Sequence, residues 1–138
     1  MVNGRAARLA QFWDDMQRSD FGHAAEIYAA DATVDLSGLE LHGRDAVREH
    51  MESFRRSFPD VSYTVHHRAE LPGDKVIEEW SCVATHDGEF MGRPASGNSV
   101  RLNAATVYEF EGEHVTRERS YMDTSRTMLK TGVLQKAP

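Results

Sequence analysis

The sequence predicts an α+β fold, because helical and strand-like patterns occupy separate parts of the chain. Apolar residues recur at helical spacing as far as Pro59, and beyond it apolar and polar residues alternate. The length of 138 residues suits a single domain, which we expect to span residues 1–138. We therefore expect a curved antiparallel sheet packed against three helices.

The three helices are predicted before Pro59, where the chain can no longer continue a helix. The first covers residues 5–18, and the second follows Asp20, which can cap its start. The third covers residues 44–57, and a short strand over residues 33–36 precedes it. The apolar side of the first helix consists of Leu9, Phe12, Trp13 and Met16.

Long strands with turn residues between them are predicted after Pro59. A terminal helical turn is expected over residues 124–129. A sheet that bends around the first helix would leave a conical cavity on its concave face, which is a typical small-molecule site. The predicted strands cover residues 61–69, 75–86, 100–110 and 115–122.

The charge balance limits the partners. With 16 Lys and Arg residues against 22 Asp and Glu residues, the net charge is -6, which disfavours nucleic acid and anionic membranes. No apolar stretch approaches the roughly 20 residues of a membrane span, and the first ten residues lack the apolar run of a signal peptide. Cys82 is the single cysteine, so we expect a buried thiol and a cytoplasmic location. A hydrophobic small molecule fits this balance better than a charged polymer.

Several short motifs carry a family likeness, in matching order from Phe12 to Gly132. They are Ser57-Phe58-Pro59-Asp60-Val61, then Trp80 with the segment from Thr85 to Gly97, and the ending from Val115 through Asp123 to Gly132. Together they resemble the SnoaL-like polyketide cyclases. That resemblance implies the cone-shaped NTF2-like fold, which agrees with the architecture predicted above.

The resemblance also implies a function. SnoaL-like cyclases close a ring of an aromatic polyketide intermediate by intramolecular aldol condensation without a cofactor, a step of antibiotic biosynthesis. The acid/base aspartate of the family falls on Asp123, and its hairpin histidine falls on His86. We make no further catalytic assignment from the family.

Both residues also have structural interpretations. A carboxyl group in an apolar cavity can remove and return protons, and Asp123 at a strand end could point into the open end of a cone. It could equally cap the predicted turn over residues 124–129. His86 could orient a substrate carbonyl or hold Asp123, or it could close the hairpin through Asp87.

Large side chains are the candidates for lining a pocket around a planar substrate, although ordinary core packing would explain any one of them. Asp35 and Asn103 could bind substrate oxygens or lie on a solvent-facing side of the sheet. Arg117, Glu118 and Arg119 are predicted to form ion pairs on the sheet surface. The large pocket candidates are Trp13, Tyr28, Trp80, Phe90, Met91 and Tyr121.

Metal and cofactor motifs are absent from the sequence, so we expect neither group. His66 and His67, as successive strand residues, are expected to face opposite ways.

Two related enzyme classes remain alternatives. The run from Tyr28 to Val34 resembles steroid isomerases, but their base position falls on Leu36 and their tyrosine donor position on Phe12. Tyr121-Met122-Asp123 resembles the ending of limonene-epoxide-hydrolase-like enzymes, whose Arg-x-Asp is missing from Glu78-Glu79-Trp80-Ser81-Cys82.

A non-catalytic binding module is a third alternative, since one fold hosts many functions. The outer sheet face, which we expect to carry Val83 and Val107, could form a homodimer.

Overall fold

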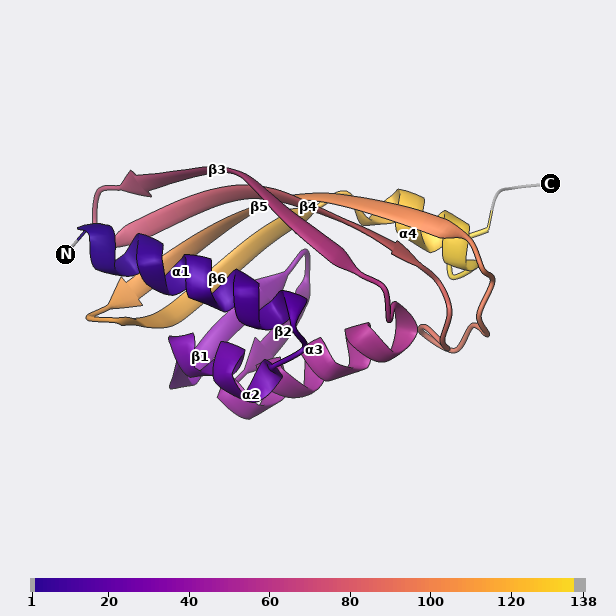
Figure 1. The fold of residues 1–138 in the computed structure, drawn as a ribbon, viewed down its shortest axis with the longest axis horizontal. Coiled ribbons are helices and arrows are strands. Elements are labelled where there is room, and N and C mark those ends of the chain that lie inside the picture. Colours follow the sequence, from indigo (N-terminus) through magenta and orange to yellow (C-terminus); the bar gives the residue numbers. More distant parts are fainter. Residues whose placement is uncertain (1, 136–138) are drawn as a thin grey trace.

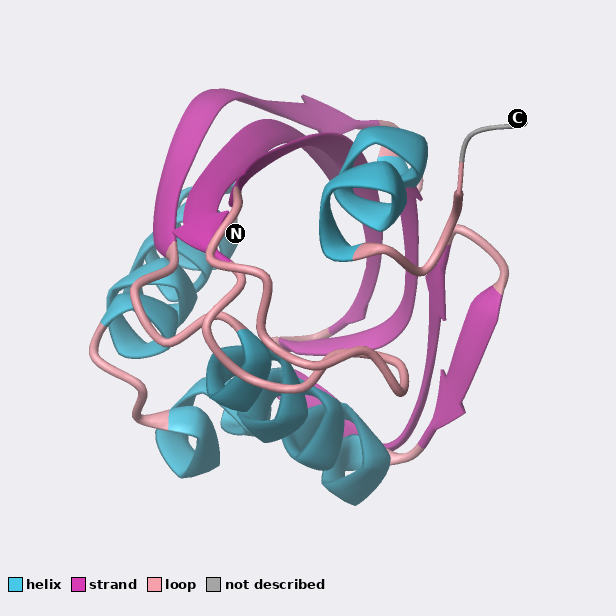
Figure 2. Cartoon of the chain, turned by 90° about the vertical axis from the view of Figure 1, so that its right-hand side faces the viewer, coloured by secondary structure: helices cyan, strands magenta, loops and turns pink. Residues whose placement is uncertain are grey.

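The computed structural model describes residues 2–135 and places four α-helices, one 3-10 helix and six strands in them. The helices pack along the open side of one strongly curved sheet (Figures 1 and 2). The elements are α1 (Val2–Gln17), α2 (Phe21–Ala24), η1 (Ala25–Ile27), β1 (Tyr28–Leu36), β2 (Leu39–His42), α3 (Arg44–Ser57), β3 (Ser62–Leu71), β4 (Lys75–Thr85), β5 (Ser99–Glu111), β6 (His114–Met122) and α4 (Thr124–Thr131).

The sheet is mixed, and its strand order is β2-β1-β6-β5-β4-β3. The meander β3–β6 is antiparallel, as predicted, but β1 lies parallel to β6. This α+β cone confirms the predicted fold class and corrects the expectation of a wholly antiparallel sheet. The parallel pair is possible because α3 and four strands separate β1 from β6 in sequence, which leaves enough chain for a crossover.

The prediction was least complete around β1. The expected strand over residues 33–36 is only the last part of β1, which begins at Tyr28, and the hairpin partner β2 was missed. The helical part of the preceding segment ends at Ile27, so Tyr28 is the first residue of the strand. The turn between β1 and β2 uses Ser37 and Gly38, both at positive φ.

A β-bulge in β3 changes which side chains reach the interior. The register with β4 shifts between Val65 and His67, and His66 and His67 are both exposed on the outside. The extra residue turns Arg68 inward, where its Nε donates to Glu78 Oε2 at 2.7 Å. The expectation that the two histidines face opposite ways is therefore wrong.

Two apolar clusters form the core. The larger joins α1 to the concave face through residues such as Leu9, Phe12 and Val115, and the smaller lies under α3 around Phe58 and Leu102. Cys82 belongs to the smaller cluster and is buried, as predicted. No helix within residues 2–135 is long and apolar enough to cross a membrane.

The segment between β4 and β5 is fixed against the end of α3. The backbone N–H groups of Asp87 and Gly88 both donate to the Ser57 carbonyl, at 3.1 and 3.0 Å. A Cβ at Gly88 would lie 2.1 Å from the Arg56 carbonyl oxygen, so only glycine allows this close approach. This contact positions Phe90 and Met91 beside the interior of the cone.

Candidate active site

A cavity of about 600 Å³ lies between the concave face of the sheet and helices α1, α3 and α4. Its size falls within the usual range for small-molecule sites, roughly 300–1,000 Å³. Leu39 and Met91 line it yet are largely exposed, so they mark its opening. Among the described residues, no lysine or arginine lines the cavity. The walls are predominantly apolar, which favours an uncharged organic ligand.

Aromatic rings form one wall. The Trp13 ring centroid lies 5.0 Å from that of Trp80 and 5.3 Å from that of Tyr63. The indole N–H groups are directed to separate polar residues: Trp13 donates to Glu78 Oε1 and Trp80 to Thr106 Oγ1, both at 2.9 Å. The rings are thus held by packing and by a hydrogen bond each, as a rigid surface for a planar ligand.

A carboxyl group lies in the wall among these aromatic residues. Glu118 lines the cavity and is 6% exposed. The Tyr28 hydroxyl donates to its Oε1 at 2.5 Å, and the Ser120 hydroxyl donates to its Oε2 at 3.2 Å. Burial raises the pKa of Glu118 from 4.5 to about 7, against the opposing effect of these two hydrogen bonds. Near neutral pH this group can therefore both accept and release a proton.

Tyr28 remains a donor throughout this range. Its pKa is held well above its usual value, chiefly by burial and then by the charge of Glu118. The neighbouring hydroxyls continue the hydrogen bonding along the wall: Ser120 Oγ lies 2.7 Å from Thr106 Oγ1. Ser120 and Thr106 both line the cavity and are almost completely buried.

A second buried carboxylate lies next to this group and has its own counter-ion. Glu78 is fully buried and accepts from Arg68 and Trp13. Glu78 also acts on Glu118, since its negative charge helps to raise the pKa of Glu118. The two glutamates thus differ in role: Glu78 is neutralised by Arg68, whereas Glu118 has only neutral donors.

His50 and Cys82 also line the cavity. Burial lowers the pKa of His50, which favours its neutral form. Burial raises the pKa of the Cys82 thiol to about 11, so at neutral pH it is protonated and is not a nucleophile.

The structure places five of the predicted pocket residues in the cavity wall: Trp13, Tyr28, Trp80, Phe90 and Met91. Their contact with a substrate stays a prediction.

The other three predicted pocket residues do not line the cavity. Asp35 Oδ1 accepts from the Gly38 backbone N–H at 2.8 Å and closes the turn after β1. Asn103 lies on the outer face of the sheet beside Tyr121, which is 61% exposed. The expectation that these side chains point into the cavity is not met.

Asp123 also lies outside the cavity. Glu118 and Ser120 point inward, so residues in the opposite phase of the strand, including Asp123, face outward. Its two oxygens accept from the backbone N–H and the side-chain amide of Asn103, at 2.8 and 3.1 Å. It occupies the N-cap position of α4 without a capping hydrogen bond from its side chain. The expected position at the open end of the cone is therefore not observed.

His86 follows the end of β4 and is enclosed by aromatic rings. It is fully buried between Phe58 and Phe90, with ring centroids 5.7 and 6.2 Å away. Its Nδ1 lies 2.8 Å from Ser96 Oγ, and the Ser96 backbone N–H also donates to it. The side chain therefore ties the segment after β4 together and does not line the cavity.

Sequence reasoning missed Glu118, Thr106 and Ser120. Glu118 was assigned to surface ion pairs with its two arginine neighbours, but only Arg117 and Arg119 reach Glu109 on the outside, at 3.8 and 2.7 Å. The available signal was strand parity, because a carboxylate between two outward arginines must face the other side of the sheet.

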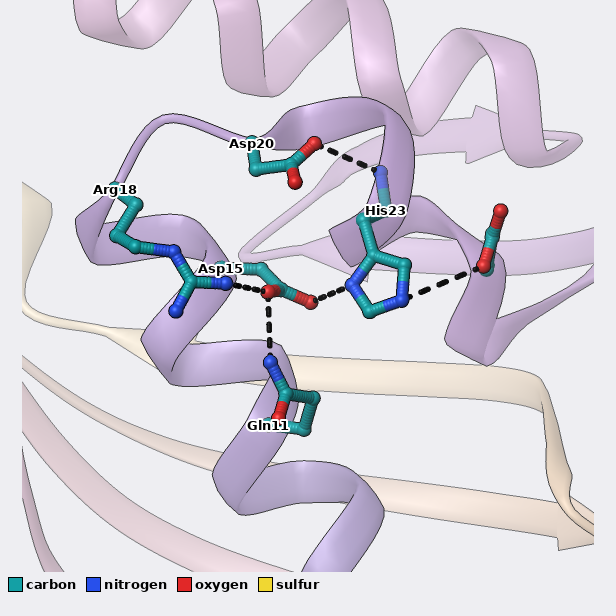
Figure 3. Close-up of polar contacts among 6 residues, drawn as sticks. Gln11, Asp15, Arg18, Asp20 and His23 are labelled. Carbon is teal, nitrogen blue, oxygen red and sulfur yellow. Dashed lines mark hydrogen bonds and ion pairs between the residues drawn. The ribbon is translucent and has the colours of Figure 1, made fainter.

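One further cluster of titratable side chains joins α1 to α2 (Figure 3). Ligand atoms of Asp15, Asp20 and His23 lie within 4.8 Å of one another, so these residues could hold a cation. The buried Asp15 carboxylate is already occupied by Gln11 at 2.8 Å, Arg18 at 2.5 Å and His23 at 2.6 Å. We interpret the cluster as an ion-pair network that fixes the turn between the helices.

Several solved structures share this fold. AclR from Streptomyces galilaeus, described as a candidate hydroxylase, is 22% identical with a TM-score of 0.86, and the match covers 100% of this chain and 87% of AclR. A candidate SnoaL-like polyketide cyclase from Jannaschia sp. CCS1 is 18% identical with a TM-score of 0.84, over 96% of this chain and 94% of that one.

IdmH from Streptomyces antibioticus, described as a candidate polyketide cyclase, is 20% identical with a TM-score of 0.78, over 93% of this chain and 98% of that one. No curated protein matches the sequence. The SnoaL-like polyketide cyclase family model matches residues 7–130, which is most of the chain. This match shows that the chain belongs to the SnoaL-like polyketide cyclase family, and the cone with its cavity agrees with it.

Proposed function

We propose that this protein closes a ring of an aromatic polyketide intermediate by intramolecular aldol condensation, with Glu118 as the general acid/base. The observation that carries this proposal is a buried carboxyl group in the cavity wall, with neutral donors and a pKa of about 7. The aspartate implied by the family resemblance, Asp123, faces away from the cavity. The proposal therefore moves the acid/base role from Asp123 to Glu118.

The chemistry needs one group that exchanges protons with the substrate. The Glu118 carboxylate removes a proton from a carbon activated by neighbouring carbonyls, and the electron pair of the C–H bond forms an enolate. The enolate carbon attacks a second carbonyl of the same molecule, which forms the ring bond and leaves an alkoxide. Protonation of the alkoxide completes the reaction and returns Glu118 to its carboxylate form.

The cavity also limits the substrate. The rings of Trp13, Tyr63 and Trp80 provide a wall for a flat, fused-ring body. The cavity combines the Glu118 carboxyl with an absence, among the described residues, of lining lysine or arginine. An ester or another uncharged derivative is therefore favoured over a free carboxylic acid.

The test uses an aromatic ester whose side chain carries a 1,3-dicarbonyl group placed to close a six-membered ring. Two rates are measured: exchange of the activated hydrogen for solvent deuterium, and ring closure. We expect Glu118→Gln to lower both rates by about 10²- to 10⁴-fold, the usual contribution of a general base. Asp123→Asn is the matched control, and it should keep both rates within about threefold because its amide side chain remains outside the cavity.

The opposite pattern, with loss of both rates in Asp123→Asn and retention in Glu118→Gln, would restore the assignment made from the resemblance. Tight binding of the ester by the wild-type protein with neither exchange nor closure would identify a binding module and overturn the enzymatic proposal.

A further inference from the structure

The hydrogen bonds behind Glu118 have a defined direction. The Trp80 indole nitrogen can only donate, so Thr106 Oγ1 accepts from it. At the other end, the Glu118 carboxylate can only accept, so Ser120 donates to it. Each hydroxyl has a single proton, and Ser120 has already given its own to Glu118. The Thr106 proton must therefore point to Ser120 across their 2.7 Å contact.

Protonation of Glu118 reverses this order. A neutral carboxyl group can donate through Oε2 to Ser120, which then turns its own proton toward Thr106. Thr106 still accepts from Trp80, so its proton can no longer point along the chain of hydroxyls. Thr106 lines the cavity, and the cavity is the remaining direction for that proton.

We propose that Thr106 and Ser120 form a proton relay that carries the proton taken up by Glu118 to the oxygen of the newly formed alkoxide. This inference rests on the proposed aldol closure and adds the path of the second proton transfer. The proton on Glu118 moves to Ser120, the Ser120 proton moves to Thr106, and the Thr106 proton moves to the alkoxide oxygen. One O–H bond forms on the product, and Glu118 is again a carboxylate.

The relay resets itself in this transfer. After the protons have moved, Ser120 again donates to Glu118 and Thr106 again donates to Ser120, which is the starting arrangement. Trp80 leaves the path a single outlet, since its N–H group donates to Thr106 and the Thr106 proton cannot point toward it. Thr106 lies on β5, Ser120 and Glu118 lie on β6, and Trp80 lies on the adjacent strand β4, so the path is held by the sheet.

A first experiment tests the coupling without any substrate. The Trp80 indole N–H signal is followed by ¹⁵N NMR as a function of pH and is assigned with Trp13→Phe, which removes the other indole. We expect it to titrate with the midpoint of Glu118, near pH 7, because the hydroxyl that accepts from Trp80 turns when Glu118 takes up a proton. The titration should disappear in Glu118→Gln and in Thr106→Val. An indole signal that is insensitive to the Glu118 midpoint would overturn the relay even if the protein proves to be a cyclase.

A second experiment separates the two proton transfers. Thr106→Val keeps the shape of the side chain and replaces the hydroxyl with a methyl group. Hydrogen exchange at the activated carbon should stay within about threefold, because Glu118 is retained, while ring closure falls about 10- to 100-fold. Closure fails because an alkoxide that is not protonated reverts to the open chain. Thr106→Ser should restore closure, and Thr64→Val, on the exposed side of β3, is the matched control.

Equal losses of exchange and closure in Thr106→Val would assign Thr106 to support of Glu118 and would refute the relay. A wild-type protein that performs neither step would refute the proposed function first, while the NMR titration would still report on the hydroxyl chain.

Discussion

Both faces of the sheet carry an ion pair between an arginine and a glutamate, but the two pairs differ in their burial. On the inner face Arg68 contacts Glu78 at 2.7 Å, and on the outer face Arg119 contacts Glu109 at the same distance. The Glu78 side chain is fully buried, whereas the Glu109 and Arg119 side chains are each 29% exposed. The contact distances are equal, but only the inner carboxylate is fully buried, so we expect removal of its partner to cost more.

The carboxyl groups of β6 and its end differ in the same way. Glu118 and Asp123 are five residues apart, an odd separation, so they lie on opposite faces. Burial raises the pKa of Glu118 to about 7, whereas Asp123 is exposed and hydrogen-bonded to Asn103. The acid/base role proposed for Glu118 therefore depends on strand parity as much as on residue type.

Removal of one partner from the inner ion pair should have the largest effect on stability. Arg68→Met leaves the Glu78 carboxylate buried without its counter-ion, which typically costs about 3–5 kcal/mol. Arg119→Met removes the outer partner and should cost at most about 1 kcal/mol, the usual value of an exposed pair. Urea unfolding of both variants measures the difference.

The double variant Arg68→Met/Glu78→Met tests the cause of that loss. It should recover most of the stability, because the buried charge that lost its partner is itself removed. Equal unfolding free energies for Arg68→Met and Arg119→Met would show that the two faces do not differ in this respect.

The next largest effect should be on the pH dependence of stability, and it should come from Glu118. Because burial raises the pKa of Glu118 from 4.5 to about 7, the folded protein keeps a proton that the unfolded chain releases between these pH values. Stability should therefore fall as pH rises from 4.5 to 7, by about 3 kcal/mol for this group. Glu118→Gln should remove that decline and be more stable than wild type at pH 8. Thermal unfolding across pH 4.5–8 gives both slopes, and parallel curves for Glu118→Gln and wild type would contradict the raised pKa.

The sequence predicted much of the architecture because local patterns determine it. Residues 44–57 form the third helix as expected, since an apolar stripe defines it and Pro59 stops it. The site was predicted less well because its polar members depend on register. A single bulge at His66 turned Arg68 inward, and no local pattern marks where such a bulge falls.

The aromatic wall could be predicted from the sequence, because large apolar side chains that face the inside of a small cone lie close to one another. The inward position of Glu118 was not predicted. A glutamate between two arginines looks like part of a row of surface ion pairs, unless the alternation of side chains along the strand is taken into account. The family resemblance directed attention to Asp123, which shares the motif but faces outward.

A smaller effect is expected from the hydroxyl that donates to Glu118. The Tyr28 hydrogen bond favours the carboxylate and so lowers the pKa of Glu118 relative to burial alone. Tyr28→Phe should raise that pKa above 7 and slow hydrogen exchange at pH 7 several-fold, since a hydrogen bond to a charged group contributes roughly 1.5–3 kcal/mol. The rate should recover at higher pH, where Glu118 ionises again. Tyr121→Phe, on the outer face, should leave the midpoint of the pH–rate profile unchanged, and an unchanged midpoint in Tyr28→Phe would remove Tyr28 from the site.

The smallest effect should come from the network between α1 and α2, where a solvent-exposed histidine meets a buried carboxylate. The Asp15 hydrogen bond and charge raise the pKa of His23 above 6.5, with smaller contributions from Glu26 and Asp20. A raised pKa in the folded state means that the stabilising effect is complete below pH 6.5 and is lost as pH rises through the folded value. His23→Gln should therefore lower the unfolding temperature slightly at pH 6 and have a smaller effect at pH 8.5, whereas Glu118→Gln should raise the unfolding temperature at pH 8. Because the imidazole is exposed, its charge is screened, and 1 M NaCl should reduce the difference at pH 6. The buried Glu118 should keep its pH dependence in the same salt, so salt sensitivity separates a surface titration from one inside the cavity.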